Sequence, residues 1–520
     1  MTESVITLVV LGATVVLFIL DRIPVAVVAL LVPLTLWAAG VLELGEATAG
    51  FGDPTVLFIA ALFVVSEALD KTGVTAWVGD FAMKHGGESQ TRLMVTVMLV
   101  VAVLTALISP NGAVAALTPV VVVIAIRGKR SPSELLLPTA FSAHAGSLLM
   151  LTGSPVTVLV ADYVESVTGE RVGLFSIAAI GVPLVLVTIL MVILFGSKLI
   201  PMRTPARALR DFGAHGDTLA QHYGVEGSHA TLMERGSGAA EFIIPPRSSF
   251  IGDVVHRGMT TESGELVVAA MHHKGQDVRE ELTLTAGDTL LFQGSWSALD
   301  NAALDPNIIA VDSPDVVRRQ AVPLGEGAKR AIGVLAGMVL LLATGLVPAP
   351  VAGMVAAMAM VALGVLKVDE AYRGISWTTV ILVGGMMSLS AAMVSSGAAQ
   401  TLAEGLVALV GDAGPYALLA GLFLITAVLG QLISNTATAL IVIPVGLSAA
   451  VQLDVSPVPV LLSVAVFAAG ALLTPVATPA NLMVMEAAGY RFGDYWKLGL
   501  PLLLLYGLAG IFLVPFFWPF

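Results

Sequence analysis

The sequence predicts an all-α polytopic membrane protein built as an inverted repeat, with a small α+β insert between the two halves. Three observations support this fold class: an apolar composition, polar breaks at matched positions in the two halves, and a polar central segment. Hydrophobic residues make up 57% of the 520 residues and charged residues only 12%. This composition is typical of membrane proteins rather than of soluble globular domains.

The matched breaks are Ser109-Pro110-Asn111 and Ser434-Asn435-Thr436, and each interrupts a long apolar run. The interval from Ser109 to Ser434 is the same as the interval from Pro119 to Pro444. A bilayer interior contains no water to satisfy a broken helix, so such breaks persist only where protein surrounds them or where they line a site. The matched breaks therefore predict an internal duplication with a transport site near the membrane midplane.

Each half contains five apolar stretches of roughly spanning length and one broken run. The first half, 1–202, has stretches near 5–20, 24–42, 55–70, 134–165 and 173–200, with the broken run at 92–126. The second half, 328–520, has stretches near 331–346, 349–366, 377–394, 458–488 and 497–518, with the broken run at 415–450. The two broken runs predict re-entrant hairpins, each made of two short helices joined at a polar tip.

The basic residues predict the orientation, because cytoplasmic loops collect Lys and Arg. An outside N-terminus places Lys198, Arg203, Arg373 and Arg491 inside, and leaves Arg171 outside. Five crossings in each half then turn the second half upside down, so the two hairpins enter from opposite faces. We expect a multi-pass protein of the cell (inner) membrane with both termini outside.

Between the halves, the segment 203–327 is polar and holds six of the eight histidines. Alternating apolar residues at 241–244, 265–269 and 288–292 predict β-strands. We therefore expect a cytoplasmic insert, with a flexible connector followed by a small α+β domain at about 240–310.

Several function classes are disfavoured by the same sequence. The net charge of −12 argues against a nucleic-acid partner, and the absence of cysteine removes thiolate nucleophiles and Cys-ligated metals. The spans contain no nucleophile–base pair and no cluster of metal ligands. We therefore expect no enzyme activity and no cofactor.

A second pair of breaks follows the hairpins, at Ser154-Pro155-Val156-Thr157 and at Thr478-Pro479-Ala480-Asn481, separated by nearly the same interval as the tips. Oxygen atoms at a helix break can coordinate sodium, and the helix N-termini that the break exposes favour an anion. The candidate substrate-binding residues are Ser109, Asn111, Ser434, Asn435, Thr436 and Thr478. The candidate sodium ligands are Ser109, Asn111, Ser154, Thr157, Ser434, Asn435, Thr438, Thr478 and Asn481.

Other interpretations of these residues stay open at this point. Ser, Thr and Asn also form hydrogen bonds between membrane helices without binding any ligand. His144, near the first-half break, is either a hydrogen-bonded buried histidine or a group for proton coupling. Because no Lys or Arg occurs between Arg373 and Arg491, an anion in that half would depend on amides, hydroxyls and a bound cation.

At these residues the chain resembles the divalent anion:sodium symporter family (DASS) of the ion transporter superfamily. Ser434-Asn435-Thr436 matches the Ser-Asn-Thr signature of that family, and 474–482 and 489–501 match two neighbouring segments. The resemblance implies that two tips and two unwound helices hold sodium, with the substrate between them, and that an elevator motion operates within a homodimer. The first-half tip departs from the signature, since Pro110 and Asn111 stand where Asn and Thr are expected.

The insert resembles the C-terminal ligand-binding module of potassium-transport regulators (TrkA-C or RCK-C), on the segments 242–252 and 284–291. This resemblance implies that the insert binds a small ligand of unknown identity.

Together these features predict a secondary active transporter that imports a divalent anion, such as a C4-dicarboxylate or sulfate, with sodium. The alternatives are a cation/proton antiporter or an oxyanion exporter of the same superfamily, and a membrane sensor that has lost transport. An antiporter is expected to need titratable groups at the breaks, and the four breaks contain none.

Overall fold

The computed structural model describes residues 2–20, 22–74, 77, 89–127, 131–203, 215–223, 237–314, 317, 324–325, 327–410, 414–475 and 477–520. The chain forms two compact units. The helical unit comprises Met1–Ala68, Ala82–Arg207 and Gly333–Phe520, and the sheet unit comprises Leu69–Phe81 and Ala208–Ile332. Most of the connector predicted before the sheet lies outside the described residues.

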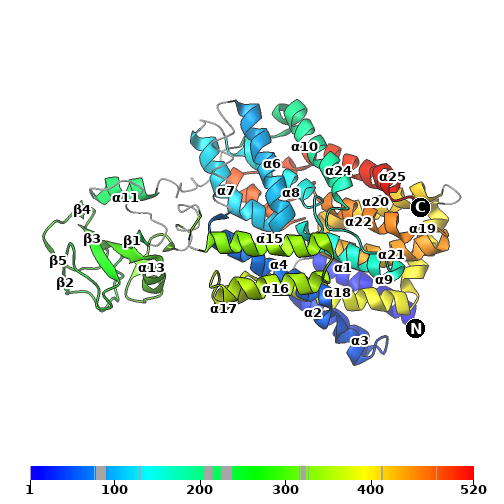
Figure 1. Ribbon diagram of the computed structural model, residues 1–520, viewed down its shortest axis with the longest axis horizontal. Coiled ribbons are helices and arrows are strands. Elements are labelled where there is room, and N and C mark those ends of the chain that lie inside the picture. The colour runs from blue at the N-terminus through cyan, green and yellow to red at the C-terminus, as the bar shows by residue number, and fades with distance from the viewer. Residues whose placement is uncertain are drawn as a thin grey trace. The chain divides into compact units, whose positions relative to one another are not determined.

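The described residues of the first half of the chain form helices joined by short connections (Figure 1). Its helices are α1 (Glu3–Leu20), α2 (Val25–Ala38), α3 (Leu44–Ala49), α4 (Pro54–Lys71), α6 (Gln90–Ile108), α7 (Pro110–Arg127), α8 (Ser133–Gly146), α9 (Pro155–Thr168) and α10 (Ala178–Leu199), with short 3₁₀ turns η1 (Gly50–Gly52) and η2 (Leu151–Gly153).

The second half contains corresponding helices in the same order, and one helix, α19, that the sequence did not predict as a span. They are α15 (Ala328–Thr344), α16 (Ala349–Ala362), α17 (Val368–Gly374), α18 (Trp377–Ser395), α19 (Ala398–Val410), α20 (Pro415–Leu432), α21 (Asn435–Gln452), α22 (Pro457–Ala469), α23 (Pro479–Ala488), η5 (Phe492–Asp494), α24 (Trp496–Leu508), the π-helical turn η6 (Ala509–Leu513) and α25 (Val514–Phe517).

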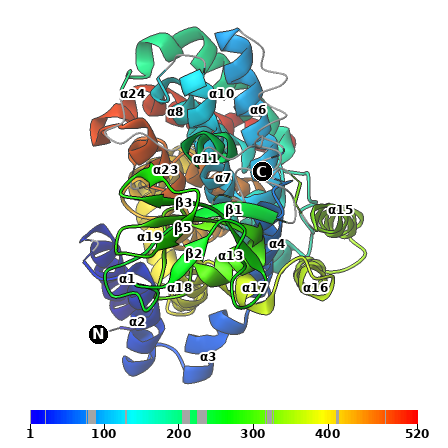
Figure 2. The same cartoon turned by 90° about the vertical axis from the view of Figure 1, so that its left-hand side faces the viewer.

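The two halves repeat their elements at a nearly constant interval. The helix after each hairpin tip shows it best, because α7 covers residues 110–127 and α21 covers residues 435–452. Both ends of α21 thus follow those of α7 by the interval that separates Ser434 from Ser109. In Figure 2 the pair α15 and α16 lies on the other side of the helical unit from its counterpart, the pair α1 and α2.

Eight helices among the described residues are long and apolar enough to cross a bilayer, which agrees with a polytopic membrane protein. They are Glu3–Leu20, Leu44–Lys71, Thr91–Ile108, Ala178–Leu199, Trp377–Ser395, Pro415–Leu432, Asn435–Gln452 and Trp496–Phe517. Shorter apolar helices are Val25–Ala38, Ala349–Ala362, Ala398–Leu409 and Pro457–Ala469.

Small residues allow the helices to approach one another closely. Gly385 on α18 faces α2, where a Cβ would lie 2.1 Å from the carbonyl oxygen of Ala29. Only glycine fits at such a contact, because van der Waals packing of membrane helices depends on backbone approach. The two helices belong to different halves, so this contact fixes one half against the other.

The sheet unit contains a five-stranded sheet in the order β4-β3-β6-β1-β7. Its strands are β1 (Ser237–Ile243), β3 (Leu266–His273), β4 (Gln276–Asp277), β6 (Thr289–Ser295) and β7 (Ile309–Ala310), all paired antiparallel. A smaller sheet pairs β2 (Val254–His256) with β5 (Glu281–Thr283). Two helices, α11 (His215–Tyr223) and α13 (Trp296–Ala302), accompany them. The predicted strands overlap β1, β3 and β6.

Candidate functional site

The first hairpin tip is a tight turn between α6 and α7. Ser109 joins them with φ of 108°, a backbone conformation that is uncommon for a residue other than glycine. Pro110 opens α7, where a missing N–H has no helical partner to lose. The Ser109 hydroxyl accepts a long hydrogen bond, 3.4 Å, from Gly112 N. The proline therefore starts the second helix of the hairpin at once.

The second tip begins its helix in a more ordinary way. Ser434 has φ of −63° and caps α21, with its Oγ accepting from Ala437 N at 3.3 Å. The side chains of the next two residues, Asn435 and Thr436, are not needed for the cap. They are left available for other contacts.

Both predicted breaks are present and are longer than a single proline kink. In the first half, α8 ends at Gly146 and α9 begins at Pro155, where the Ser154 hydroxyl caps the helix by accepting from Val156 N at 3.2 Å. In the second half, α22 ends at Ala469 and α23 begins at Pro479. A proline thus opens each new helix, as its fixed φ favours.

The two tips and the two breaks line one cavity of about 490 Å³. Seven of the predicted site residues lie on its wall: Ser109, Asn111, Ser154, Ser434, Asn435, Thr436 and Thr478. Three others, Thr157, Thr438 and Asn481, are buried and do not line it. Folding therefore brings the matched segments of the two halves, far apart in the sequence, into a single site.

Among the described residues that line this cavity there is no Lys, Arg, Asp or Glu, and His144 is the only histidine. Five helices begin at lining residues: α2 at Val25, α7 at Pro110, α9 at Pro155, α21 at Asn435 and α23 at Pro479. A helix N-terminus carries a partial positive charge of about half an elementary charge. The described wall of the cavity thus has no charged side chain, and it exposes five helix N-termini together with the C-terminal ends of α6 and α20.

A very small separate cavity of about 20 Å³ lies between the second tip and the first-half break. Ser154, Thr157 and Asn435 line it, together with His144 and Ser147. A volume of about 10–15 Å³ is enough for one water molecule. The space therefore suits one water or one small ion surrounded by side-chain oxygens.

His144 connects the two halves through the second-half break. Its Nε2 lies 3.1 Å from Asn481 Oδ1 and 3.2 Å from Thr478 Oγ1, and the ring is buried. Asn481 Nδ2 donates to the carbonyls of Ala471 and Thr474 at 3.0 and 3.1 Å, so its Oδ1 must be the atom facing the imidazole. Since Oδ1 only accepts, Nε2 carries a proton and donates it.

The side-chain oxygens of the two halves differ in their partners. Asn111 Oδ1 accepts from Ala480 N at 3.2 Å, and Thr157 Oγ1 lies 2.7 Å from the Ser154 carbonyl. By contrast, Asn435 Oδ1 and Thr438 Oγ1 are buried without a hydrogen-bond partner in the described part of the chain. Buried polar atoms are nearly always paired, so these two oxygens, one of them on the cavity wall, need an explanation.

Sequence reasoning missed three contributors to this region. Gln431, in the last turn before the second tip, bonds the unwound stretch: its Nε2 donates to Gly470 O at 3.3 Å, and its Oε1 accepts from Leu473 N at 2.8 Å. Thr378 and Thr379, at the start of α18, also line the cavity. A lone amide in an apolar run was the available signal for Gln431, and nothing marked the threonines.

An ion pair fastens the end of the first half to the second. The Arg203 guanidinium donates twice to Asp494, from Nε to Oδ2 at 2.9 Å and from Nη2 to Oδ1 at 2.8 Å. The Asp494 side chain is only 8% exposed. Through these bonds, Arg203 holds the pKa of Asp494 below its ordinary value. The pair therefore ties the chain just before the insert to the junction of α23 and α24.

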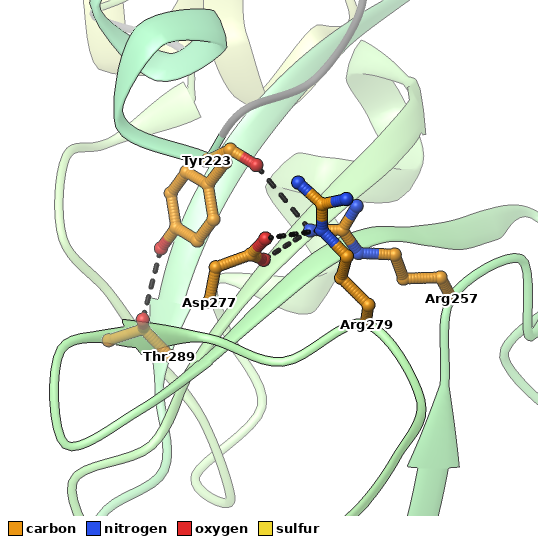
Figure 3. Close-up of polar contacts among 5 residues, drawn as sticks. All are labelled: Tyr223, Arg257, Asp277, Arg279 and Thr289. Atoms are coloured by element: carbon orange, nitrogen blue, oxygen red, sulfur yellow. Dashed lines mark hydrogen bonds and ion pairs between the residues drawn. The ribbon is translucent and has the colours of Figure 1, made fainter.

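The sheet unit contains a polar cluster of its own, shown in Figure 3. Tyr223 OH at the end of α11 donates to Glu241 Oε1 at 2.6 Å and lies 3.0 Å from Thr289 Oγ1. Arg257 and Arg279 both point toward Asp277 (Figure 3). Burial and then the bond to Glu241 raise the pKa of Tyr223.

The Tyr223 ring also stacks on His272, with centroids 4.2 Å apart. Burial lowers the pKa of His272. The cluster therefore anchors α11 on the sheet.

Three related proteins indicate what this chain is similar to. An uncharacterized transporter of Escherichia coli, YfbS, is 28% identical over 98% of this chain and 98% of its own length. An uncharacterized transporter of Synechocystis, sll0640, is 24% identical over 98% of this chain and 96% of its own length. A probable sodium/sulfate cotransporter 3 of Chlamydomonas reinhardtii is 28% identical over 45% of this chain and 27% of its own length.

Among solved structures, the YdaH transporter of Alcanivorax borkumensis has a TM-score of 0.48 and 14% identity, covering 91% of this chain and 88% of that chain. A family model described as a citrate transporter matches residues 15–439 and 408–520, which together span nearly the whole sequence. The family and these full-length relatives are transporters, not enzymes. The chain therefore belongs to the CitMHS citrate transporter family.

Proposed function

We propose that this protein is a secondary active transporter that imports a divalent anion, such as a C4-dicarboxylate or sulfate, together with sodium. The observation that carries the proposal is the convergence of both hairpin tips and both helix breaks on one cavity of about 490 Å³. Breaks at membrane depth are expected at a transport site, because irregular backbone in a bilayer must be buried or line a cavity.

Binding of an anion is supported by the backbone rather than by side-chain charge. None of the described lining residues is Lys or Arg, while five helices begin on the wall of the cavity. Their exposed N–H groups and dipoles favour a negative ligand. The helix N-termini do not fully neutralise the charge of a dianion, so a bound cation would strengthen its binding.

Binding of sodium is supported by the unpaired oxygens of the second tip. Within the described part of the chain, Asn435 Oδ1 is unpaired, and Asn435 lines the small cavity of about 20 Å³ together with Ser154 and Thr157. Unwound helices with free oxygens are the usual places for sodium in transporters of this kind. The buried Thr438 hydroxyl, one turn further along α21, is unpaired among the same residues and is a further candidate ligand.

The names of the related proteins and of the family point to different anions as the substrate. Relatives named sodium/sulfate cotransporters match part of the chain, whereas the family model is named for a tricarboxylate. A cavity of about 490 Å³ has room for either kind of anion. We therefore propose the shared chemistry, a small divalent oxyanion, as the substrate class.

We also propose the location, the assembly and the transport motion of the protein. We place the protein in the inner membrane as an inverted repeat and a homodimer with both termini outside, working by an elevator motion. The sheet unit then lies in the cytoplasm as a TrkA-C-like module that binds a small ligand.

Uptake by proteoliposomes tests the proposal. The purified full chain is reconstituted, and uptake of labelled succinate and labelled sulfate is followed under an inward sodium gradient, with an equal potassium gradient as the control. We expect uptake of at least one of the two anions with sodium only. Excess unlabelled sulfate should reduce succinate uptake if both anions share the site.

The variant Asn435→Ala should strongly reduce the sodium-driven component at this sodium gradient, and Val428→Ala is a matched control because Val428 on α20 is 60% exposed and does not line the cavity. Uptake that is equal in sodium and potassium would overturn sodium coupling. The absence of uptake of either anion would overturn the substrate class.

A further inference from the structure

The helical unit contains a second cavity of about 270 Å³. Its wall comes from the ends or starts of α4, α9, α15 and α16. It adjoins the candidate site, because Thr152 of η2 lines both cavities. The Thr152 hydroxyl is held there by donating to Ala106 O at 3.0 Å.

The two cavities are lined by equivalent residues of the two halves. We call two residues register mates when the interval between them equals that between Ser154 and Thr478, the first residues of the two breaks. Six pairs of register mates have one member in each cavity. In each pair the first residue lines the candidate site and the second lines the second cavity: Phe18 and Leu342, Ile19 and Ala343, Val25 and Ala349, Thr379 and Thr55, Leu382 and Phe58, Leu482 and Val158.

The helices that carry these pairs also correspond between the two halves. The end of α1, the start of α2 and the start of α18 line the candidate site, and we take this side as its mouth because Ile19 is 44% exposed. The end of α15, the start of α16 and the start of α4 form the second cavity. The two cavities are therefore lined by equivalent helix ends, with the contributions of the two halves exchanged.

In an inverted repeat, the operation that exchanges the halves also exchanges the two faces of the membrane. We propose that the second cavity is the passage between the candidate site and the face opposite its mouth. This inference rests on the proposed inverted repeat. With the N-terminus outside, the mouth at Ile19 faces the cytoplasm and the second cavity faces outward, with Thr152 at the closed point between them.

The charges of the second cavity agree with a passage that holds water. Arg171 and Glu165 line it and form an ion pair of 2.8 Å, and their side chains are 59% and 48% exposed. Charged groups in contact with lipid are costly, so side chains this exposed belong at an aqueous surface. The described lining of the candidate site, by contrast, contains no such charges.

Labelling of single cysteines tests the proposal, and the chain suits it because its sequence contains no cysteine. Register mates serve as matched pairs: Ile19→Cys with Ala343→Cys near the two mouths, and Leu482→Cys with Val158→Cys deeper in. A membrane-impermeant maleimide is applied to the full chain in right-side-out spheroplasts and in inside-out vesicles. We expect Ile19→Cys and Leu482→Cys to react several-fold faster in inside-out vesicles, and Ala343→Cys and Val158→Cys several-fold faster in spheroplasts.

A functional readout separates a passage from mere proximity to the surface. Reaction of Val158→Cys from outside should abolish uptake. Reaction of Leu340→Cys, a residue of α15 that is 63% exposed and lines neither cavity, should leave uptake unchanged. If a variant fails to assemble, the pair Thr379→Cys and Thr55→Cys replaces it.

Reaction of both members of a pair from the same face would overturn the proposal. So would a Val158→Cys that does not react from outside while Ala343→Cys does, because the second cavity would then be a closed pit. Face-specific labelling does not depend on the substrate tested. A failed uptake assay with correct labelling would therefore count against the proposed substrate and not against the passage.

Discussion

The two hairpin tips hold equivalent places in the duplicated architecture but use their oxygen atoms differently. At the first tip, the side-chain oxygen of Asn111 is occupied by the amide of Ala480. At the second tip, Asn435 Oδ1 and Thr438 Oγ1 are buried without a partner among the described residues. Leaving a buried oxygen unpaired costs about 1–3 kcal/mol. We therefore propose that the side-chain oxygen of the first tip serves mainly to hold the structure together and that those of the second tip bind a ligand.

The largest expected effect is that of Asn435→Ala on the sodium dependence of uptake. The variant Asn435→Ala removes an oxygen from the proposed sodium site, and a hydrogen bond or ligand to a charged group is worth about 1.5–3 kcal/mol. The sodium concentration for half-maximal uptake should therefore rise about tenfold to a hundredfold. Asn111→Ala is the matched control, with the sodium dependence expected to stay within about twofold. Equal losses in the two variants would remove the distinction between the tips.

The second comparison concerns the two breaks, where Asn481 is the register mate of Thr157. Asn481→Ala leaves two backbone carbonyls without their side-chain donor and removes one of the two partners of His144 Nε2, and should cost about 2–3 kcal/mol of stability. Thr157→Ala removes only a hydroxyl that donates to its own loop and should cost about 1 kcal/mol. Thermal unfolding of the detergent-purified protein measures both. A larger loss of stability in Thr157→Ala than in Asn481→Ala would contradict the view that the Asn481 side chain makes the more important hydrogen bonds at the breaks.

A third comparison uses the backbone of the tips. Ser109→Gly relieves a positive φ of 108° and should raise the unfolding temperature, because a strained residue of this kind costs about 1–3 kcal/mol. Ser434→Gly removes a helix cap at an ordinary φ and should lower stability by a few tenths of a kcal/mol. If both substitutions lower the unfolding temperature, the strain at Ser109 is offset by contacts of its side chain.

The smallest expected effect concerns the ion pair at Asp494, whose register mate is the exposed Glu170. Arg203 lowers the pKa of Asp494, so the pair stabilises the fold above the ordinary carboxyl value of 3.8 and loses this contribution as the pH falls through the lower folded pKa. Asp494→Asn should lower the unfolding temperature by a few degrees at neutral pH and have less effect in acid. Glu170→Gln should have no measurable effect at either pH. A pH-independent loss in Asp494→Asn would show that packing matters more than charge.

Much of the architecture follows from local sequence signals. The tips and breaks were predictable because Pro, Ser and Asn interrupt otherwise apolar runs, and the strands of the insert because their apolar residues alternate. The interval between the halves was readable because Pro119 and Pro444 fix the same register. The helix α19 escaped prediction, since an amphipathic segment after a span gives no distinct signal of its own.

The sequence by itself determined the class of protein, the position of the four breaks and the candidate residues, because these depend on composition and on local backbone chemistry. Only the tertiary structure decided which oxygens are free. Asn111 and Asn435 look alike in sequence, yet Asn111 Oδ1 is bonded to Ala480 across the two halves and Asn435 Oδ1 has no partner in the described part of the chain. Tertiary packing sets the hydrogen-bond partners that lie far away along the chain, so the local sequence pattern does not predict them.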